Sequence, residues 1–516
     1  MRVQDFASAA VTGGLLALTF PRFDLEPLAW VALVPLLLAL DGKAPAQSFL
    51  LGLVAGIVHY GVTLSWVVNT LVSYGRLPPL TAWAVLFLLV TYMAAYLGLF
   101  GWGLALIARA SPQRRWLLAP PLWVALELLR AHALTGFPWA SLGYSQALSL
   151  PAIQVAEITG VYGVSFALVA LNASLWHLIR YPGYRQWRVL AVGVAVVGLT
   201  VGYGFARLWD LQRQRARPWL PVALTQGNID QSRKWDEAYR QETLRIYREL
   251  SLRAAREASE GGAPVPPLVV WPESAAPFLF EREPALAEQM ARIARESGAY
   301  LLFGAPAVGR RNGQRRLLNS AYLLSPTGER LGRYDKLHLV PFGEYVPLGR
   351  FLPFVRKLVV GVADFAEGTD YTLFRAPGGR FGVLICFEVI FPQIARRFAQ
   401  GGAEFLVNIT NDAWFGRSAA SYQHIAMVAF RAVENRLPVV RAANTGITAF
   451  IDPTGRIRGA TELFRRTHVV GRIRPRRSPP TFYGRYGDLF AYACVLLVVV
   501  ALVGGFRRGR PRVWYY

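Results

Sequence analysis

Three fragments of this sequence carry side chains that can act as a nucleophile, a base and an oxyanion-stabilising cation. Cys386 closes the run FGVLIC, Glu273 follows LVVWP, and Lys336 lies in RYDKLHLVPFGEYVP. A thiolate is nucleophilic, a carboxylate can accept its proton, and an ammonium can stabilise the oxyanion formed at an attacked carbonyl. Each residue alone also has a plainer interpretation: a buried core cysteine, a solvated loop glutamate and a surface lysine.

Lysine is rare in this chain, so its presence at position 336 carries information. Among the 56 basic residues, the lysines are Lys43, Lys234, Lys336 and Lys357. Arginine would serve at this position if charge alone mattered, whereas a compact ammonium fits an oxyanion differently from a planar guanidinium. On this fragment alone, a lysine that stabilises an oxyanion and an ordinary surface lysine fit equally well.

A fourth fragment, NITNDAWFG, ends a strand-like run in Asn411, Asp412 and Trp414. Polar side chains followed by an aromatic ring are typical of a pocket lining, and an ordinary turn is the alternative because Asn and Asp favour turns. The carboxyl ends of buried strands are where α/β folds expose reactive groups. The fragments can act together only if strands and helices bring these ends to one place.

The composition indicates a membrane protein. The chain has 516 residues, 56 Lys plus Arg and 32 Asp plus Glu, which gives a formal charge of +24, yet 53% of its residues are hydrophobic. This excludes intrinsic disorder and is too apolar for an ordinary soluble protein. The two cysteines, Cys386 and Cys494, exclude a disulfide scaffold. The basic residues lie largely at joints between apolar runs, which argues against nucleic-acid binding.

The apolar runs predict a polytopic α-helical membrane domain with about eight transmembrane helices. Runs long enough to cross a bilayer are residues 47–72, 80–108, 116–134, 160–179, 189–206 and 489–506. Two shorter runs, 6–20 and 27–40, could cross or lie in the interface. If both cross, the basic joints and both termini fall on the cytoplasmic side. The predicted domains are 1–206 with seven helices, an external domain at 207–486, and a last helix with a basic tail at 487–516.

The external domain alternates strand and helix patterns, which predicts an α/β layered fold. Short buried strands are expected at 221–228, 267–271, 300–304, 320–324, 381–386, 405–409, 439–442 and 449–452. Helices are expected at 235–258, 392–400 and 422–435.

Together, the fragments around Glu273, Lys336 and Cys386 resemble the carbon–nitrogen hydrolase (nitrilase) superfamily, whose catalytic set follows this order. The resemblance implies an αββα sandwich for the external domain. A nitrilase-like domain inserted between seven membrane helices and a last one is similar to the family of bacterial apolipoprotein N-acyltransferases. The fragments QGNIDQSRKWD and PFGEYVP agree with this family, and the resemblance covers essentially the whole chain.

The resemblance implies an acyltransferase of the bacterial inner membrane, with its catalytic domain in the periplasm and both termini in the cytoplasm. Its substrates would be a phospholipid acyl donor and a diacylated apolipoprotein. The acyl chain would pass through a thioester on Cys386 to the amine of the apolipoprotein's N-terminal diacylglyceryl-cysteine, which predicts ping-pong kinetics. A monomer without a cofactor is expected. We also expect no metal, because His338 and His424 lack a Cys/His cluster at metal-binding spacing.

The resemblance also implies supporting residues. Glu344 would orient Lys336. Further pocket residues are expected to be Trp235, Phe387, Glu388, Asn411 and Trp414. Phe387 stands where the family often has tyrosine, so a hydroxyl group is missing there.

One apolar stretch is not needed by a soluble nitrilase. Residues 351–361 read FLPFVRKLVVG, with Arg356 and Lys357 set among apolar side chains. This pattern fits a loop that dips into phospholipid headgroups, and a packed surface helix is the alternative. We expect a lipid-facing arm over the nucleophile, formed by Phe351, Leu352, Phe354, Leu358, Val359 and Val360.

Two other functions fit parts of the pattern. A membrane-tethered nitrilase-type amidase could hydrolyse a small amide with the same three residues, using water as the acceptor. A transporter with an accessory domain would show inverted repeats, and seven spans plus one show no paired halves.

Overall fold

The structure is a computed structural model that describes residues 1–110, 115–181, 183, 186–213, 219–260, 265–311, 314–345, 365–476 and 479–508. It divides into two compact units. The helical unit comprises Met1–Val68, Pro79–Gln212 and Tyr486–Tyr516, and the sheet unit comprises Asn69–Pro78 and Arg213–Arg485. The short segment Asn69–Pro78 therefore belongs to the sheet unit although it lies between helices of the other unit.

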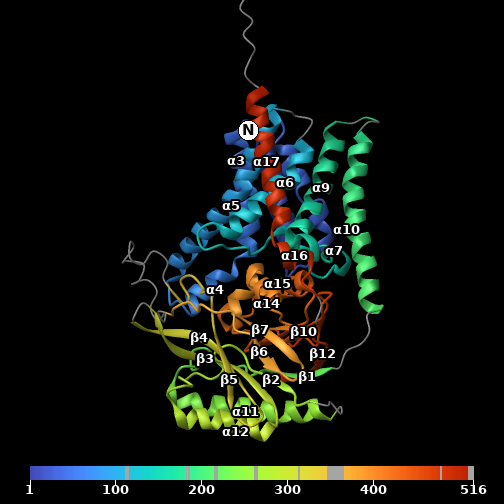
Figure 1. The fold of residues 1–516 in the computed structure, drawn as a ribbon. Coiled ribbons are helices and arrows are strands. Elements are labelled where there is room, and N and C mark those ends of the chain that lie inside the picture. Colours follow the sequence, from blue (N-terminus) through green and yellow to red (C-terminus); the bar gives the residue numbers. More distant parts are fainter. Residues whose placement is uncertain are drawn as a thin grey trace, which may run out of the picture. The chain divides into compact units, whose positions relative to one another are not determined.

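Apolar helices make up most of the helical unit (Figure 1). They are α1 (Val3–Leu18), α2 (Val34–Ala39), α3 (Pro45–Thr63), α5 (Pro79–Ala110), α6 (Arg115–His132), α7 (Leu150–Ile153), α8 (Ala156–Thr159), α9 (Val161–Arg180), α10 (Trp187–Arg213) and α17 (Leu489–Arg508). Within the described residues, four stretches are long and apolar enough to cross a membrane: Pro45–Thr63, Pro79–Arg109, Val161–Arg180 and Trp187–Leu211.

The prediction of one continuous helix at 47–72 is wrong. The helix α3 ends at Thr63, Leu64 leaves the helical backbone conformation, and α4 (Trp66–Ser73) begins two residues later. The run cannot be a single span because its continuation, Asn69–Pro78, packs as part of the sheet unit. Apolar composition alone gave no sign of this break.

Two buried charged side chains of the helical unit, Glu127 and Arg130, form hydrogen bonds with specific partners. Glu127 accepts hydrogen bonds from Trp123 Nε1 at 3.0 Å and from the backbone N–H of Leu142 at 2.7 Å. Arg130 donates to the hydroxyl of Ser141 at 3.1 Å and to that of Tyr60. The bonds to Ser141 and Leu142 fix α6 to the loop that follows it, and the bond to Tyr60 fixes it to α3.

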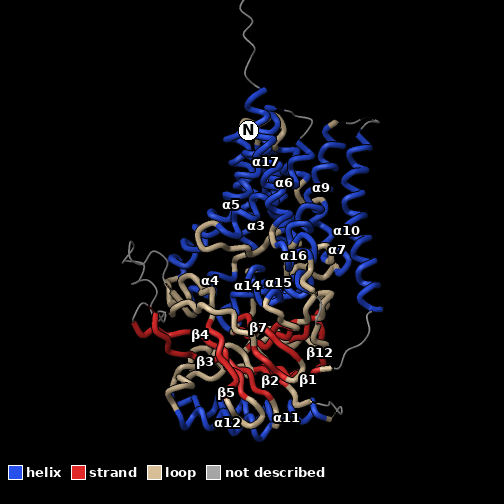
Figure 2. Tube along the Cα trace, viewed as in Figure 1, coloured by secondary structure: helices blue, strands red, loops and turns tan. Residues whose placement is uncertain are grey.

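The strands of the sheet unit form two six-stranded sheets among the described residues (Figures 1 and 2). The first has the order β12 (Thr467–Ile473), β1 (Leu220–Gln226), β2 (Leu268–Val270), β3 (Tyr300–Arg311), β4 (Gln314–Leu324) and β5 (Arg330–Asp335). The second has the order β11 (Ile457–Arg458), β10 (Ala449–Ile451), β9 (Val439–Ala443), β8 (Phe405–Thr410), β7 (Gly379–Ile385) and β6 (Phe374–Ala376). The central strands β1–β2–β3 and β7–β8–β9 pair in parallel.

Helices cover the outer faces of the two sheets, which gives a layered αββα arrangement. The first sheet packs against α11 (Glu237–Ser259), which in turn contacts α12 (Pro284–Ser297), and the second sheet packs against α14 (Pro392–Gln400) and α15 (Ala420–Asn435) (Figure 1). The inner faces meet where β1 lies against β9 and β4 against β7. Parallel strands buried on both faces read as continuous apolar runs, which is why β7 and β8 were recognisable in the sequence.

Most expected elements of the external domain are present with shifted ends. The helix α14 has the expected bounds, and β3 is longer than the expected 300–304. The elements missed from the sequence include β5, β6, β11, β12, α12 and the short helix α16 (Phe482–Tyr486). Edge strands such as β5 and β12 are only half buried, so they lack the apolar run that marks a central strand.

Candidate active site

Cys386 is the first residue after β7, where the buried strand turns sharply. Its φ of +52° lies in the left-handed region, which a non-glycine residue adopts only where its surroundings impose it. The side chain is 8% exposed. The turn therefore presents a nearly buried thiol at the carboxyl end of a central parallel strand.

Glu273 is the third residue after β2 and is anchored by Trp271, the first residue after that strand. Trp271 is fully buried, stacks on Tyr247 at 4.7 Å between ring centroids, and donates from Nε1 to Ser251 Oγ at 2.7 Å. On β3, a Cβ added at Gly304 would lie 2.8 Å from Glu273 Cα and 2.4 Å from the next backbone nitrogen. Glycine there lets the strand end approach closely enough to fix the carboxylate.

The carboxylate of Glu273 accepts hydrogen bonds from both sheets. Its Oε1 accepts from Asn319 Nδ2 at 2.8 Å and lies 3.5 Å from Lys336 Nζ, and its Oε2 accepts from the backbone N–H of Asn411 at 3.0 Å. Asn319 lies on β4 and Asn411 directly follows β8. The two sheets thus hold the glutamate from both sides.

Lys336 directly follows β5 and lies between two carboxylates. Its Nζ is 2.9 Å from Glu344 and 3.5 Å from Glu273, and its side chain is 1% exposed. Burial disfavours the ammonium form, but the two carboxylates outweigh burial and raise the pKa of Lys336. The lysine is therefore held as a cation throughout the neutral pH range.

The thiol of Cys386 has a raised pKa. Burial is the main cause, the carboxylate of Glu273 adds to it, and the ammonium of Lys336 acts in the opposite direction. At neutral pH the free thiol therefore predominates over the thiolate. Attack by this sulfur requires a proton acceptor, and a nearby carboxylate and ammonium supply the acceptor and the stabilising charge for acyl transfer.

Glu388 holds both the turn that contains Cys386 and the loop that contains Lys336. Its Oε2 accepts from the backbone N–H of Ile385 at 2.7 Å, and its Oε1 accepts from the N–H of Leu337 at 2.6 Å and from the hydroxyl of Tyr334 at 2.8 Å. The side chain is fully buried. One carboxylate therefore couples the residue before Cys386 to the residue after Lys336.

The remaining expected pocket residues do not all reach this cluster. Asn411 does, whereas the ring of Phe387 packs against those of His338 and Phe391, at centroid distances of 6.0 and 5.2 Å. Trp235 is 47% exposed. Its side chain is therefore partly open to solvent and does not belong to the buried cluster of Glu273, Lys336 and Cys386.

Trp414 is 37% exposed and contacts the segment that interrupts the helical unit. Its ring meets that of Tyr74 at 5.1 Å, and its carbonyl oxygen accepts from Thr70 Oγ1 at 2.8 Å. The segment Asn69–Pro78 thus lies next to the fragment that follows β8. No sequence pattern indicated that residues from the apolar half would contribute here.

The predicted arm at 351–361, with Phe351, Leu352, Phe354, Leu358, Val359 and Val360, lies outside the described residues. Within the described part of the chain, no group of three or more His, Cys, Asp or Glu side chains could hold a metal ion.

Two residues of the cluster were missed by sequence reasoning. Asn319 Nδ2 donates to both Glu273 and Glu344 at 2.8 Å, and nothing in the run LLNSAYLL marks it. Lys234 is 2% exposed and donates from Nζ to the backbone oxygen of Glu273 at 3.0 Å. The rarity of lysine, which drew attention to Lys336, applied equally to Lys234.

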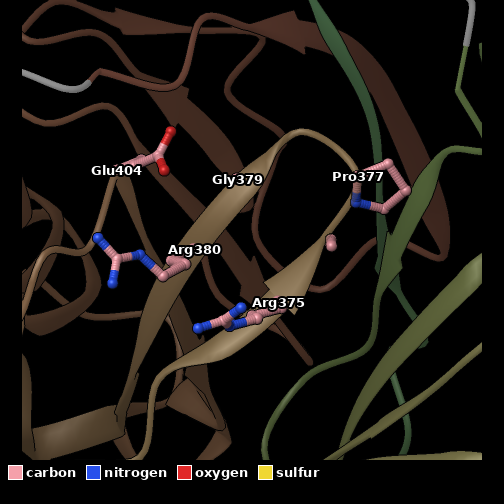
Figure 3. A pocket seen from close by; sticks show the side chains of 6 residues that line it. Arg375, Pro377, Gly379, Arg380 and Glu404 are labelled. Atoms are coloured by element: carbon pink, nitrogen blue, oxygen red, sulfur yellow. The ribbon is translucent and has the colours of Figure 1, made fainter.

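A separate pocket lies at the start of β7, at the opposite end of the strand from Cys386. It is lined by Arg375, Ala376, Pro377, Gly379, Arg380 and Glu404 (Figure 3). Since seven strand residues span roughly 20 Å, this pocket is not part of the cluster around the thiol.

Comparisons with known sequences agree with this geometry. The profile of the apolipoprotein N-acyltransferase N-terminal domain matches residues 12–174, and the carbon–nitrogen hydrolase profile matches residues 221–477. An apolipoprotein N-acyltransferase from Geobacter metallireducens is 47% identical over 98% of this chain and 96% of its own length. Proteins of the same name from Pseudomonas syringae and Bradyrhizobium diazoefficiens are 34% and 36% identical, each over 96% of this chain and over 96% and 94% of their own lengths. The chain belongs to the apolipoprotein N-acyltransferase family.

Proposed function

We propose that this protein transfers an acyl chain from a membrane phospholipid to the N-terminal amine of a diacylglyceryl-cysteine apolipoprotein. The observation that carries the proposal is the position of Lys336 between Glu273 and Glu344, in electrostatic contact with the thiol of Cys386. This arrangement suits acyl transfer, and it occurs in a chain that also has helices of membrane-spanning length. The family supplies the substrate classes.

The first half-reaction forms a thioester. Glu273 accepts the proton of Cys386 as the sulfur attacks the ester carbonyl of the phospholipid, and a C–S bond forms. Lys336 stabilises the tetrahedral oxyanion. The C–O bond then breaks, and the lysophospholipid leaves with the proton that Glu273 returns to its oxygen.

The second half-reaction forms an amide. The amine of the apolipoprotein attacks the thioester carbonyl, and Glu273 takes a proton from the nitrogen. The C–S bond breaks, and Cys386 regains a proton as the N-acylated product leaves. Because the donor product departs before the acceptor reacts, initial rates follow ping-pong kinetics.

The supporting residues act through these three. Glu344 and Asn319 hold Lys336 and Glu273 at their observed separations, and Glu388 fixes the turn before the nucleophile. Further pocket residues in this proposal are Trp235, Phe387, Asn411 and Trp414. The apolar arm at 351–361 admits the donor lipid, a role supported by its cations set among apolar residues.

The proposed topology has eight crossings in the bacterial inner membrane, with both termini cytoplasmic and the catalytic domain periplasmic. The proposed domain limits are 1–206, 207–486 and 487–516. The asymmetry of basic residues between alternate joints supports this orientation. The chemistry is complete with the side chains named above, so we propose a monomer without a metal or cofactor.

The test supplies the purified protein with phospholipid labelled in its acyl chains and a peptide that begins with diacylglyceryl-cysteine. The label is expected to appear on the peptide as an amide that resists mild base. The same peptide with an acetylated amine is the matched control and should remain unlabelled. Release of the label only as free fatty acid, or hydrolysis of small amides without transfer, would contradict the proposal and favour the amidase alternative.

A further inference from the structure

Lys234 is a second buried lysine at the site, and neither of its neighbours is buried. It lies in the loop between β1 and α11, where Arg233 and Trp235 are exposed while the side chain of Lys234 is 2% exposed. Its Nζ donates to the backbone oxygen of Glu273 at 3.0 Å. Among the described residues this is the one hydrogen bond of an ammonium that has three N–H donors.

The ammonium of Lys234 also interacts electrostatically with the reacting groups. Burial lowers its pKa to about 8, while the Glu273 carboxylate and the Cys386 sulfur both favour its charged form. A lysine whose only purpose was to hold a carbonyl oxygen could be replaced by a neutral donor. A buried cation is costly unless nearby negative charge compensates for it.

The charges of the site explain why a second cation is useful. With the thiol protonated, Glu273 and Glu344 carry two negative charges and Lys336 carries one positive charge. The other buried carboxylates have partners of their own: Glu388 accepts from four hydrogen-bond donors, and Asp412 is paired with Arg441 at 2.8 Å. Without a further cation, a thiolate would form in a nearly buried cluster with an excess negative charge.

We propose that Lys234 supplies this second positive charge and stabilises the Cys386 thiolate during formation of the thioester. When the sulfur's proton moves to Glu273, the carboxylate becomes neutral and the sulfur becomes negative, so the cluster keeps two negative charges. Lys336 and Lys234 balance both. The inference rests on the proposed function in that Cys386 is the nucleophile.

The test measures how fast iodoacetamide alkylates Cys386, because this reaction reports the thiolate and requires neither lipid nor lipoprotein. The full-length protein in detergent carries Cys494→Ala, so that Cys386 is the remaining cysteine, and peptide mass spectrometry gives the rate between pH 6 and 10. Lys234→Met removes the charge, and Lys234→Arg retains it. Arg233→Met removes one positive charge from the exposed neighbour and is the matched control.

Lys234→Met is expected to alkylate about tenfold more slowly at pH 7, equivalent to a rise of about one unit in the thiol pKa. Arg233→Met should stay within about twofold of the parent, because an exposed charge is screened. Since a guanidinium keeps its proton where Lys234 loses one, the rate of Lys234→Arg relative to the parent should rise above about pH 8. A lysine that only tethered the backbone would give no such pH-dependent ratio.

Thermal unfolding midpoints show which variants are folded. If Lys234→Met does not fold, the inference is tested by the alkylation rate of Lys234→Arg relative to the parent as the pH changes. If Lys234→Arg does not fold, it is tested by the alkylation rate of Lys234→Met. A folded Lys234→Met with the parent's rate at every pH would overturn the inference, as would a flat ratio for Lys234→Arg. Failure of the proposed function is distinguishable, since the parent would then alkylate as expected yet fail to acylate the lipopeptide.

Discussion

Lys336 and Glu344 form a buried ion pair in which the ammonium nitrogen lies 2.9 Å from the carboxylate, with side chains 1% and 11% exposed. The same ammonium is 3.5 Å from Glu273. Glu344 is therefore the closer of its two anionic partners. Glu273 is therefore less tightly paired with Lys336 than Glu344 is, and it remains available to accept the proton of the thiol.

Replacing Glu344 with Gln should damage both stability and catalysis. The change leaves Lys336 with one distant carboxylate, and breaking a buried pair costs about 3–5 kcal/mol. Thermal unfolding and single-turnover acylation of Cys386 should both show the loss. Glu296→Gln is the control, because it breaks an ion pair with Arg248 whose side chains are 46% and 33% exposed, and such pairs contribute at most about 1 kcal/mol. Equal effects of the two variants would contradict the interpretation.

Asn319 bridges two carboxylates by donating to both, so Asn319→Asp should be more harmful than Asn319→Ala. The introduced carboxylate would repel Glu273 and Glu344 in place of a donor. As the pH falls, the introduced carboxyl binds a proton and can donate again, so the gap between the two variants should narrow toward acidic pH. Acylation rates measured from pH 8 down to pH 5 check this. A gap that is constant or widens toward acid would show that charge is not the cause.

Glu388→Gln should loosen the turn of Cys386, because an amide nitrogen would face at least one backbone N–H that now donates to an oxygen. Leaving a buried donor without an acceptor costs about 1–3 kcal/mol. We expect slower acylation together with a lower unfolding midpoint. Tyr334→Phe is the control that removes one hydroxyl donor to the same carboxylate, and its effect should be smaller. A Glu388→Gln variant as active as Tyr334→Phe would argue against a role of Glu388 in holding the turn of Cys386.

Gly304→Ala should displace Glu273 by pressing on its backbone, since the added Cβ would lie 2.8 Å from Glu273 Cα. The added Cβ would lie 2.4 Å from the backbone nitrogen of Ser274, and backbone atoms cannot yield as a flexible side chain can. Overpacking of this kind costs about 1–3 kcal/mol, and the acylation rate should fall with stability. Gly202→Ala in α10 is the control, because nothing lies within 4 Å of its added Cβ. Similar losses of activity and stability in both variants would contradict the explanation that the added Cβ displaces Glu273.

The sequence predicted the parts of the fold that depend on local pattern. The buried runs that became β7 and β8 and the amphipathic helix α14 are recognisable because their apolar residues follow one period over several residues. The order of Glu273, Lys336 and Cys386 indicated their family. Their meeting depends on how the two sheets pack, because Glu273 and Lys336 follow strands of the first sheet and Cys386 follows a strand of the second.

The parts that could not be predicted depend on contacts between residues far apart in the chain. Asn319 meets Glu344 only because the middle of β4 pairs with the end of β5, next to the loop that carries Glu344, and a single Asn in an apolar run carries no periodic signal. The break after Thr63 depends on where Asn69–Pro78 packs, which apolar composition does not encode. The half-buried strands β5 and β12 likewise take their conformation from their neighbours in the sheet.

The most direct test of the central claim is mass spectrometry of the full-length protein incubated with phospholipid and no acceptor. We expect one acyl group on the peptide that contains Cys386, lost on addition of a diacylglyceryl-cysteine peptide and absent from the Cys386→Ala variant. An acyl group on another residue, or N-acylation of the lipopeptide by Cys386→Ala, would contradict the claim.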